Sequence, residues 1–276
     1  MELLLFTAAP FVLAPFAPLL IKVGGRRALA FVSTGLIAIL FVAALLTLPR
    51  VTQEGPLTFA LPWVPDLGLT LSFYLDGLAL LFTVLVTGVG IAVFHYTGYF
   101  FDDADEQARF TGWMLVFTGS MLWVVLAGNI LALFIAWELT SISSFMLIGF
   151  KGAKDIKARR GALQALMITG GGGLALFVGL LLTGSAAGSM ELADILAVSI
   201  VEHPYYTAAM LLVALGAFTK SAQFPFHFWL PGAMSAPSPA SAFLHSATMV
   251  KAGVYLLARM YPTLGNSPLW TDLLTV

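Results

Sequence analysis

The chain of 276 residues contains no cysteine, so disulfides, thiolate metal ligands and thiol catalysis are excluded within it. Charged residues are also scarce, at 10% of the total, and the net charge of -1 gives no reason to expect a nucleic-acid partner. The sequence has neither a phosphate-binding Gly-Lys-Ser/Thr loop nor a pair of histidines with haem or metal spacing. We therefore expect a chain that hydrolyses no ATP and needs no cofactor or metal.

Apolar residues are abundant instead. The chain is 59% hydrophobic with a mean hydropathy of +0.95, whereas a soluble domain is about 45–50% apolar. This composition predicts an all-α polytopic membrane protein. The N-terminus has an acidic second residue and no basic segment, so we expect it to open the first span and not to be a cleaved signal peptide. Segments near the required length of about 20 residues give eight expected transmembrane helices, at residues 3–21, 28–48, 73–100, 110–127, 129–150, 161–183, 205–235 and 240–261.

Turn and break signals divide these spans. The seventh is too long for one straight helix, and Pro225 should break it, because proline lacks an N–H and clashes with the carbonyl of Ser221. Gly128 and Asn129 are expected to form the turn between the fourth and fifth spans. The loop over residues 49–71 contains four prolines and short alternating runs, which predict a small surface hairpin.

The distribution of basic residues predicts the orientation of the chain. Nine of the 13 Lys and Arg residues fall on one side of an eight-span arrangement, and Arg50 alone falls in a loop on the other. Because basic loops stay in the cytoplasm, we expect an N-terminus outside the cell. The nine are Lys22, Arg26, Arg27, Arg109, Lys151, Lys154, Lys157, Arg159 and Arg160.

Glu138 and Lys220 are the first candidates for ion handling. Glu138 is the only charged residue between Arg109 and Lys151 and lies within the fifth span; intramembrane carboxylates usually mark ion or proton routes. Lys220 precedes the expected break in the seventh span, and a lysine can exchange between charged and neutral forms whereas an arginine cannot. A tunable pair and a fixed salt bridge both fit these two residues. Ser141 lies one turn after Glu138 on the same face and is expected to hydrogen-bond a partner or a water.

A second group of candidates lies in the eighth span. His245, Thr248 and Lys251 follow at spacings of three, so on one helix they are neighbours that climb about 9 Å. We interpret them as a proton route, with helix-to-helix polar packing as the alternative. His227 follows the break and is expected either to gate the route or to cap the chain there.

Other intramembrane features fit structural roles. Asp76 is expected to start the third span, and Arg259 to extend its side chain to the outer membrane surface. The glycine run over residues 170–173 in the sixth span permits close helix packing.

Three stretches carry a family resemblance: FIAWELTSISSFMLIGF, the segment from TKSAQFPFHFWLPGAM to LLARMYP, and YLDGLALLF. They resemble the proton-translocating antiporter-like subunits, which include Mrp sodium/proton antiporters and the membrane arm of respiratory complex I. The residues after Glu138 resemble the A-type subunits of Mrp antiporters more than they resemble the large complex I subunit. The resemblance implies that Glu138 pairs with Lys220 of the broken helix, that His245 and Lys251 relay protons, and that His227 matches a family histidine.

The resemblance also implies a domain plan. Family subunits contain two inverted five-helix repeats. Residues 1–100 would form three N-terminal helices with the extracellular hairpin at 49–71, residues 110–263 would form the first repeat, and 264–276 would lead to the second. That second repeat is missing here, so the chain is expected to be a fragment, or one part of a split subunit.

The resulting expectation is a subunit of a multi-subunit Na+/H+ antiporter in the plasma membrane, a secondary transporter and not an enzyme. Its expected partners are the other subunits, including a chain or segment that supplies the second repeat, together with protons, Na+ and the lipid bilayer. Alternatives are a proton-pumping subunit of complex I or a membrane hydrogenase, a non-transporting assembly scaffold, and a subunit of an inorganic-carbon uptake system.

Overall fold

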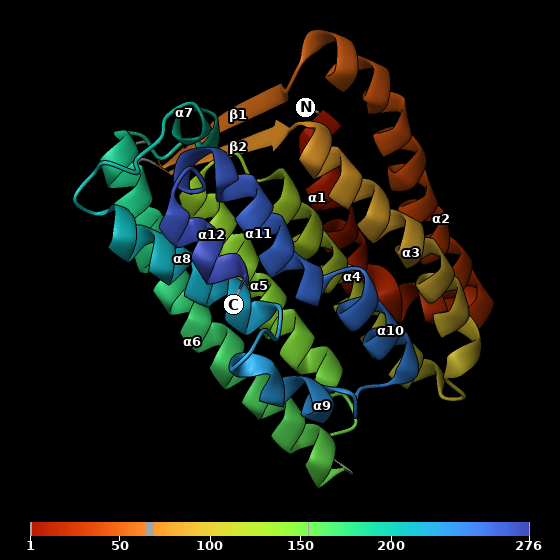
Figure 1. Ribbon diagram of the computed structural model, residues 1–276. Coiled ribbons are helices and arrows are strands. Elements are labelled where there is room, and N and C mark those ends of the chain that lie inside the picture. The colour runs from red at the N-terminus through yellow and green to blue at the C-terminus, as the bar shows by residue number, and fades with distance from the viewer. Residues whose placement is uncertain (1, 65–68, 154, 276) are drawn as a thin grey trace.

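A computed structural model describes residues 2–64, 69–153 and 155–275. An apolar helical stretch of 53 residues runs from Glu2 to Glu54, as α1 (Glu2–Leu13), a 3-10 turn (Ala14–Phe16) and α2 (Ala17–Glu54). It bends at Gly25, whose φ of 74° is readily adopted by glycine. The bend separates the first two predicted spans, and Figure 1 shows α2 returning past α1.

A β-hairpin follows α2. Strand β1 (Leu57–Val64) pairs antiparallel with β2 (Leu69–Leu75), and residues 65–68 between them, which the expected hairpin includes, lie outside the described residues. The hairpin occupies a later segment than 49–71, because residues 49–54 extend the helix α2. It lies at the same end of the molecule as the N-terminus (Figure 1).

Four long helices form the centre of the chain: α3 (Gly77–Phe100), α4 (Ala104–Leu126), α5 (Ile130–Ile148) and α6 (Ile156–Ala187). Each is long and apolar enough to cross a membrane. Each also begins after a side chain that accepts a hydrogen bond from its first turn, which stabilises a helix start; the caps are Asp76, Asp103, Asn129 and Asp155. Helix α4 ends at Leu126 and α5 begins directly after Asn129, which confirms the predicted turn between the fourth and fifth spans.

The seventh predicted span is interrupted, as expected. After the short α7 (Leu192–Leu196), helix α8 (Tyr206–Lys220) ends five residues before Pro225. The chain continues as a 3-10 turn (Phe226–Trp229) and α9 (Leu230–Ala233). The helix therefore ends at Lys220 itself, and the irregular segment starts earlier than the proline predicts.

The eighth predicted span is also interrupted, so the expectation of one helix over 240–261 is wrong. It consists of α10 (Ser238–Ser246) and α11 (Met249–Leu264). The backbone leaves the helical region at Thr248 (φ -127°, ψ -92°), whose hydroxyl donates to the Phe243 carbonyl at 2.6 Å. The segment 264–276, expected as a tail, contains helix α12 (Pro268–Thr275), which lies near α8 and α11 in Figure 1.

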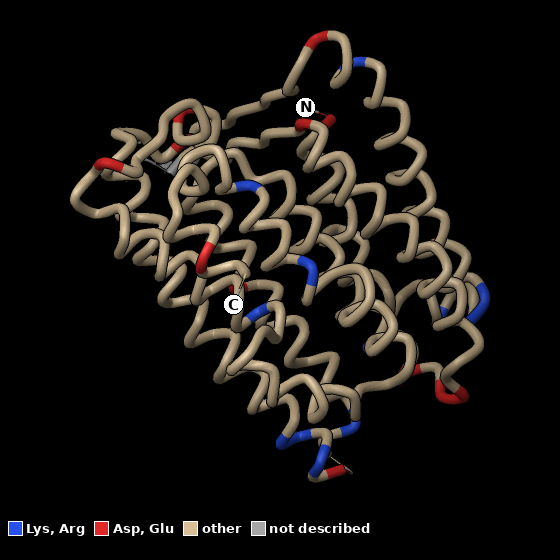
Figure 2. Tube along the Cα trace, in the orientation of Figure 1, with Lys and Arg blue, Asp and Glu red and all other residues tan. Residues whose placement is uncertain are grey.

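Many of the basic residues cluster at one end of the molecule. Figure 2 shows Lys and Arg positions gathered near the ends of the helices opposite the hairpin, around the α2 bend and the start of α6. Arg50 lies at the hairpin end, where it pairs with Glu2 at 2.9 Å. This arrangement agrees with the loop pattern used to predict orientation. Lys154, one of the nine basic residues in that pattern, lies outside the described residues.

Candidate ion-pathway site

Lys220 lies at the centre of the candidate site. It is the last residue of α8 and its side chain is fully buried. Its Nζ donates to the Trp137 carbonyl at 3.0 Å and to Ser141 Oγ at 2.7 Å, both on α5. It also lies 4.9 Å from the centroid of a Trp137 ring, which is a favourable cation–π distance. Ser141 therefore has the hydrogen-bonding role expected from its position.

Neighbouring elements satisfy the backbone at this helix end. The Trp229 indole N–H donates to the Thr219 carbonyl at 2.9 Å, and the Ser221 hydroxyl donates to the Val250 carbonyl at 2.6 Å. Gly253 of α11 lets the helices meet, because a Cβ there would overlap both the Ala217 carbonyl oxygen and Ser221 Oγ. Broken helices persist at membrane depth where protein groups satisfy the backbone in this way.

Glu138 follows Trp137 in helix α5. Its Oε1 is buried and makes no hydrogen bond to any described residue. This oxygen faces Gly173 of α6, where a Cβ would overlap it. Glu138 and Lys220 interact electrostatically, but within the described ranges they form no ion pair at 4.0 Å or less. The ammonium contacts neutral oxygens of α5 instead.

Gly172 and Gly173, two of the four glycines over residues 170–173, have the close-packing role expected of the run. A Cβ at Gly172 would overlap Thr219 Oγ1 of α8, and one at Gly216 would lie 2.5 Å from Leu176 Cβ. Helices α6 and α8 therefore approach closely beside Lys220. Gly170 and Gly171, in contrast, have nothing within 4 Å of an added Cβ.

His245 lies near the end of α10, with its ring 6.4 Å from that of Trp229. It interacts with the backbone of Ala233, but neither ring nitrogen makes a hydrogen bond of good geometry to the part of the chain that the structure describes. A buried polar group without a partner is costly. The ring is thus a polar group available to a water or a mobile proton.

The remaining candidates are more dispersed than one helix predicts. Because the chain breaks after α10, His245, Thr248 and Lys251 do not form a single helical row. Thr248 is buried and donates to the Phe243 carbonyl, whereas Lys251 is exposed on α11. His227 is also exposed and stacks against Phe224, with ring centroids 5.9 Å apart. The structure brings together Lys220, Ser141 and the helix turn of Glu138, and leaves Lys251 and His227 on the surface.

Sequence reasoning missed a buried ion pair. The Arg259 guanidinium donates to both carboxylate oxygens of Asp76, at 2.5 and 2.8 Å. Its side chain is only 2% exposed, so the expectation that it extends to the membrane surface is wrong. Asp76 also caps α3, as predicted, by accepting from the Ala79 N–H. Because 183 residues separate the two positions, no local sequence pattern predicts the pair.

Trp137 and Trp229 were also missed. The Trp137 carbonyl accepts from Lys220, and the buried Trp229 ring closes the broken segment. Each tryptophan lies within two residues of a candidate residue in the sequence, but a carbonyl or indole contact has no spacing pattern that identifies it.

Comparison with known families gives two matches. Residues 127–276 match the family described as NADH:quinone oxidoreductase/Mrp antiporter, TM. Residues 62–111 match the N-terminal part of chain 5 of NADH-ubiquinone oxidoreductase, complex I. Together these segments include β2, α3 and every helix from α5 onward.

Several longer proteins are similar to the chain. It is 47% identical over 266 residues to a probable K(+)/H(+) antiporter A/B-type subunit of Rhizobium meliloti, covering 94% of this chain and 26% of that protein. It is 42% identical to the A-type subunit of the Na(+)/H(+) antiporter of Alkalihalophilus pseudofirmus, covering 98% and 34%. The chain thus spans about a quarter to a third of the length of these relatives.

Solved structures show the same fold. A chain of the Mrp complex from Dietzia sp. DQ12-45-1b aligns with a TM-score of 0.89 and 36% identity, over 99% of this chain and 30% of that one. A chain of respiratory complex I from Thermus thermophilus aligns with a TM-score of 0.75 and 22% identity, over 96% and 54%. The second likeness shows the fold alone.

Proposed function

Since the chain belongs to the NADH:quinone oxidoreductase/Mrp antiporter transmembrane family, we propose that it is part of a subunit of a multi-subunit monovalent cation/proton antiporter in the plasma membrane. The observation that carries this proposal is the fully buried Lys220 at the end of the broken α8. An ionisable group at membrane depth is expensive, and such groups usually mark ion routes.

The local geometry supports a proton exchange centred on Lys220. Its ammonium is held by a carbonyl and a hydroxyl, both neutral acceptors, so losing a proton leaves no unpaired buried anion in that contact. Ser141 accepts from Lys220 and is able to pass a proton on through its own O–H. The Glu138 carboxylate, which lies within electrostatic range, stabilises the charged form of the lysine. Proton transfer would therefore be coupled to the distance between the two.

The other candidates would connect this centre to the rest of the complex. His245, whose ring nitrogens make no hydrogen bond of good geometry to the described residues, would take the next proton. The exposed Lys251 would continue the route toward a second repeat. Thr248 has its hydroxyl bound to the Phe243 carbonyl and would position the break. His227, at the irregular segment after α8, would gate access. Partner subunits, protons and Na+ complete the proposal, with the N-terminus and hairpin outside the cell.

The test is cation-dependent proton flux in inside-out vesicles that contain the intact complex. We expect Lys220→Ala to abolish Na+-dependent proton efflux while the complex still co-purifies. The matched control is Lys157→Ala, an exposed lysine on α6, which should retain flux. Unchanged flux in assembled Lys220→Ala complexes would move the chain to the scaffold role.

One competing function is a redox-driven proton pump, because the chain shares its fold with the complex I chain. The same vesicles separate the two. Flux that appears only after a reduced electron donor is added would identify the redox pump, whereas flux driven by a cation gradient alone supports the antiporter.

A further inference from the structure

A cavity of about 370 Å³ opens at the basic end of the molecule, between the start of α4 and the connection from α5 to α6. Two arginines from different helices line it: Arg109 in α4 and Arg159 in the first turns of α6. Trp113 and Phe150 form part of its wall. The volume falls within the range of about 300–1,000 Å³ that is typical of small-molecule sites.

The two guanidinium groups have no acidic partner in the described part of the chain. Arg109 lies 5.7 Å from the Phe150 ring centroid, and neither arginine forms an ion pair at 4.0 Å or less with any described residue. The nearest acidic positions along the chain, which are Asp105, Glu106 and Asp155, do not line the cavity. Two like charges that converge on one space repel each other unless an anion enters, and guanidinium groups match phosphate oxygens in geometry.

The position of the cavity indicates which kind of anion would fit it. It lies at the ends of three helices that are each long and apolar enough to cross a membrane, α4, α5 and α6. Residues such as Phe145 and Met146 continue its wall along α5. An inorganic phosphate would use only the arginines, whereas a phospholipid would also place acyl chains against these apolar side chains. Basic pockets at the cytoplasmic ends of helices are suited to anionic headgroups.

We propose that this cavity binds the phosphate of an anionic phospholipid through Arg109 and Arg159. The site is separate from Lys220 and does not depend on the proposed transport activity. Bound lipid would join α4 to the α5–α6 connection.

The test is a lipid titration of the intact, delipidated complex by native mass spectrometry, with phosphatidylglycerol compared with phosphatidylcholine. We expect stronger binding of phosphatidylglycerol, and a loss of about tenfold or more in its affinity in the double variant Arg109→Gln/Arg159→Gln, since each charge-assisted hydrogen bond contributes substantially. Arg160→Gln is the matched control, because Arg160 is the exposed neighbour that does not line the cavity.

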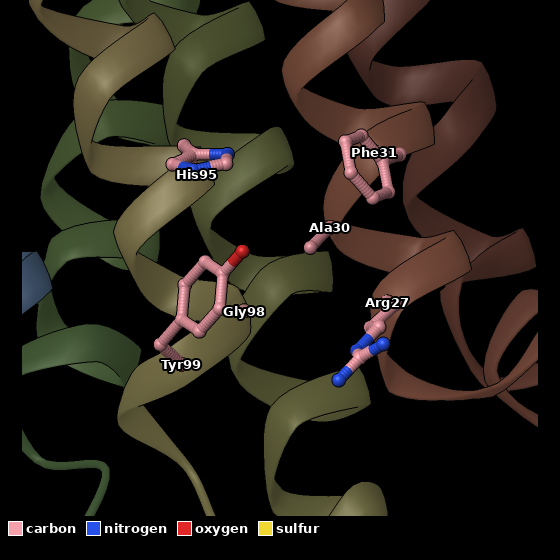
Figure 3. A pocket seen from close by; sticks show the side chains of 6 residues that line it. All are labelled: Arg27, Ala30, Phe31, His95, Gly98 and Tyr99. Atoms are coloured by element: carbon pink, nitrogen blue, oxygen red, sulfur yellow. The ribbon is translucent and has the colours of Figure 1, made fainter.

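A second control uses the hollow shown in Figure 3, where Arg27 of α2 faces His95 and Tyr99 of α3. Arg27 brings a single guanidinium group to this hollow. If a pair of arginines is needed, Arg27→Gln should therefore keep the phosphatidylglycerol affinity within about twofold of wild type. If Arg160→Gln or Arg27→Gln lost as much phosphatidylglycerol affinity as the double variant, the proposed site would be overturned, because such losses would indicate diffuse charge attraction.

Two wild-type measurements keep the proposal testable if the double variant does not assemble. Equal affinity for the two lipids would overturn it. Inorganic phosphate that displaces phosphatidylglycerol at equal concentration would overturn the lipid assignment, since the apolar wall would then contribute nothing. Retention of phosphatidylglycerol against inorganic phosphate supports it.

Discussion

At the scale of single residues, position 220 distinguishes proton exchange from a fixed charge. Lys220→Arg keeps a positive charge but cannot release its proton. If Lys220 takes part in proton transfer, we expect cation-dependent flux in vesicles to fall by about tenfold or more in this variant. If the lysine only holds α5 and α8 together by its charge, Lys220→Arg should retain most of the flux.

Because arginine is also larger than lysine, Lys220→Arg needs a control for packing. Lys220→Met has a similar length and no charge, so it should also lose flux if a proton is exchanged. A variant pair in which arginine is active and methionine is inactive would contradict proton release and favour a structural cation. Co-purification of partner subunits must remain normal in both variants.

A second residue-scale prediction concerns the space around Glu138. Gly173→Ala would place a Cβ on the present position of Glu138 Oε1, so the carboxylate must move or the helices must separate. Overpacking of this kind costs about 1–3 kcal/mol, and we expect reduced flux together with a lower melting temperature. Gly171→Ala is matched in chemistry, but its Cβ would meet nothing within 4 Å, and it should be neutral. Equal effects of the two would contradict a role for the Gly173 contact.

The sequence indicated these residues but not how they face one another. Glu138, Lys220 and Ser141 were identifiable because charge and hydroxyl groups are conspicuous in apolar spans. Their direct contacts were not, since Lys220 binds a carbonyl of Trp137, and every residue has a carbonyl. Whether Glu138 and Lys220 close into an ion pair during transport stays a prediction.

At the scale of elements, the Asp76–Arg259 pair joins the start of α3 to α11. Arg259 is 2% exposed and Asp76 is 25% exposed. Removing one partner of a fully buried pair costs about 3–5 kcal/mol, which is the upper limit here, so Arg259→Met should lower the melting temperature of the purified complex. The exposed pair Arg50–Glu2, with side chains 48% and 70% exposed, is the control, and Arg50→Met should cost about 0–1 kcal/mol.

The double variant Asp76→Asn/Arg259→Met tests whether the cost comes from an unpaired charge. It should be more stable than Arg259→Met alone, because the partly buried side chain at position 76 is then neutral. Additive destabilisation in the double variant would instead indicate that the two side chains act independently.

The two helix breaks differ in how far the sequence predicts them. Pro225 predicts an interruption of the seventh span, because proline cannot continue a helix. The helix in fact ends earlier, at Lys220. The break between α10 and α11 has no proline or glycine at residues 247 and 248. It depends on Thr248 donating to the Phe243 carbonyl and on packing against other helices, and neither is encoded as a local pattern.

At the scale of the whole molecule, the positions of the charged loops predict which face each end of the bundle presents. The chain contains no cysteine, so one introduced thiol can report on one position. We expect Lys157→Cys, at the basic end, to react with a membrane-impermeant maleimide only in inside-out vesicles. Glu202→Cys, in the loop before α8 at the opposite end, should react in intact cells. Both positions are exposed.

This labelling tests orientation independently of transport, because neither position belongs to the proposed pathway. The parent complex without the introduced thiol measures labelling of cysteines in partner subunits and is subtracted. Reversed accessibility of the two positions would place the hairpin and N-terminus in the cytoplasm, against the positive-inside rule. It would also move the Arg109–Arg159 cavity to the outer leaflet, where fewer anionic lipids are present, so the lipid titration and the labelling experiment constrain each other.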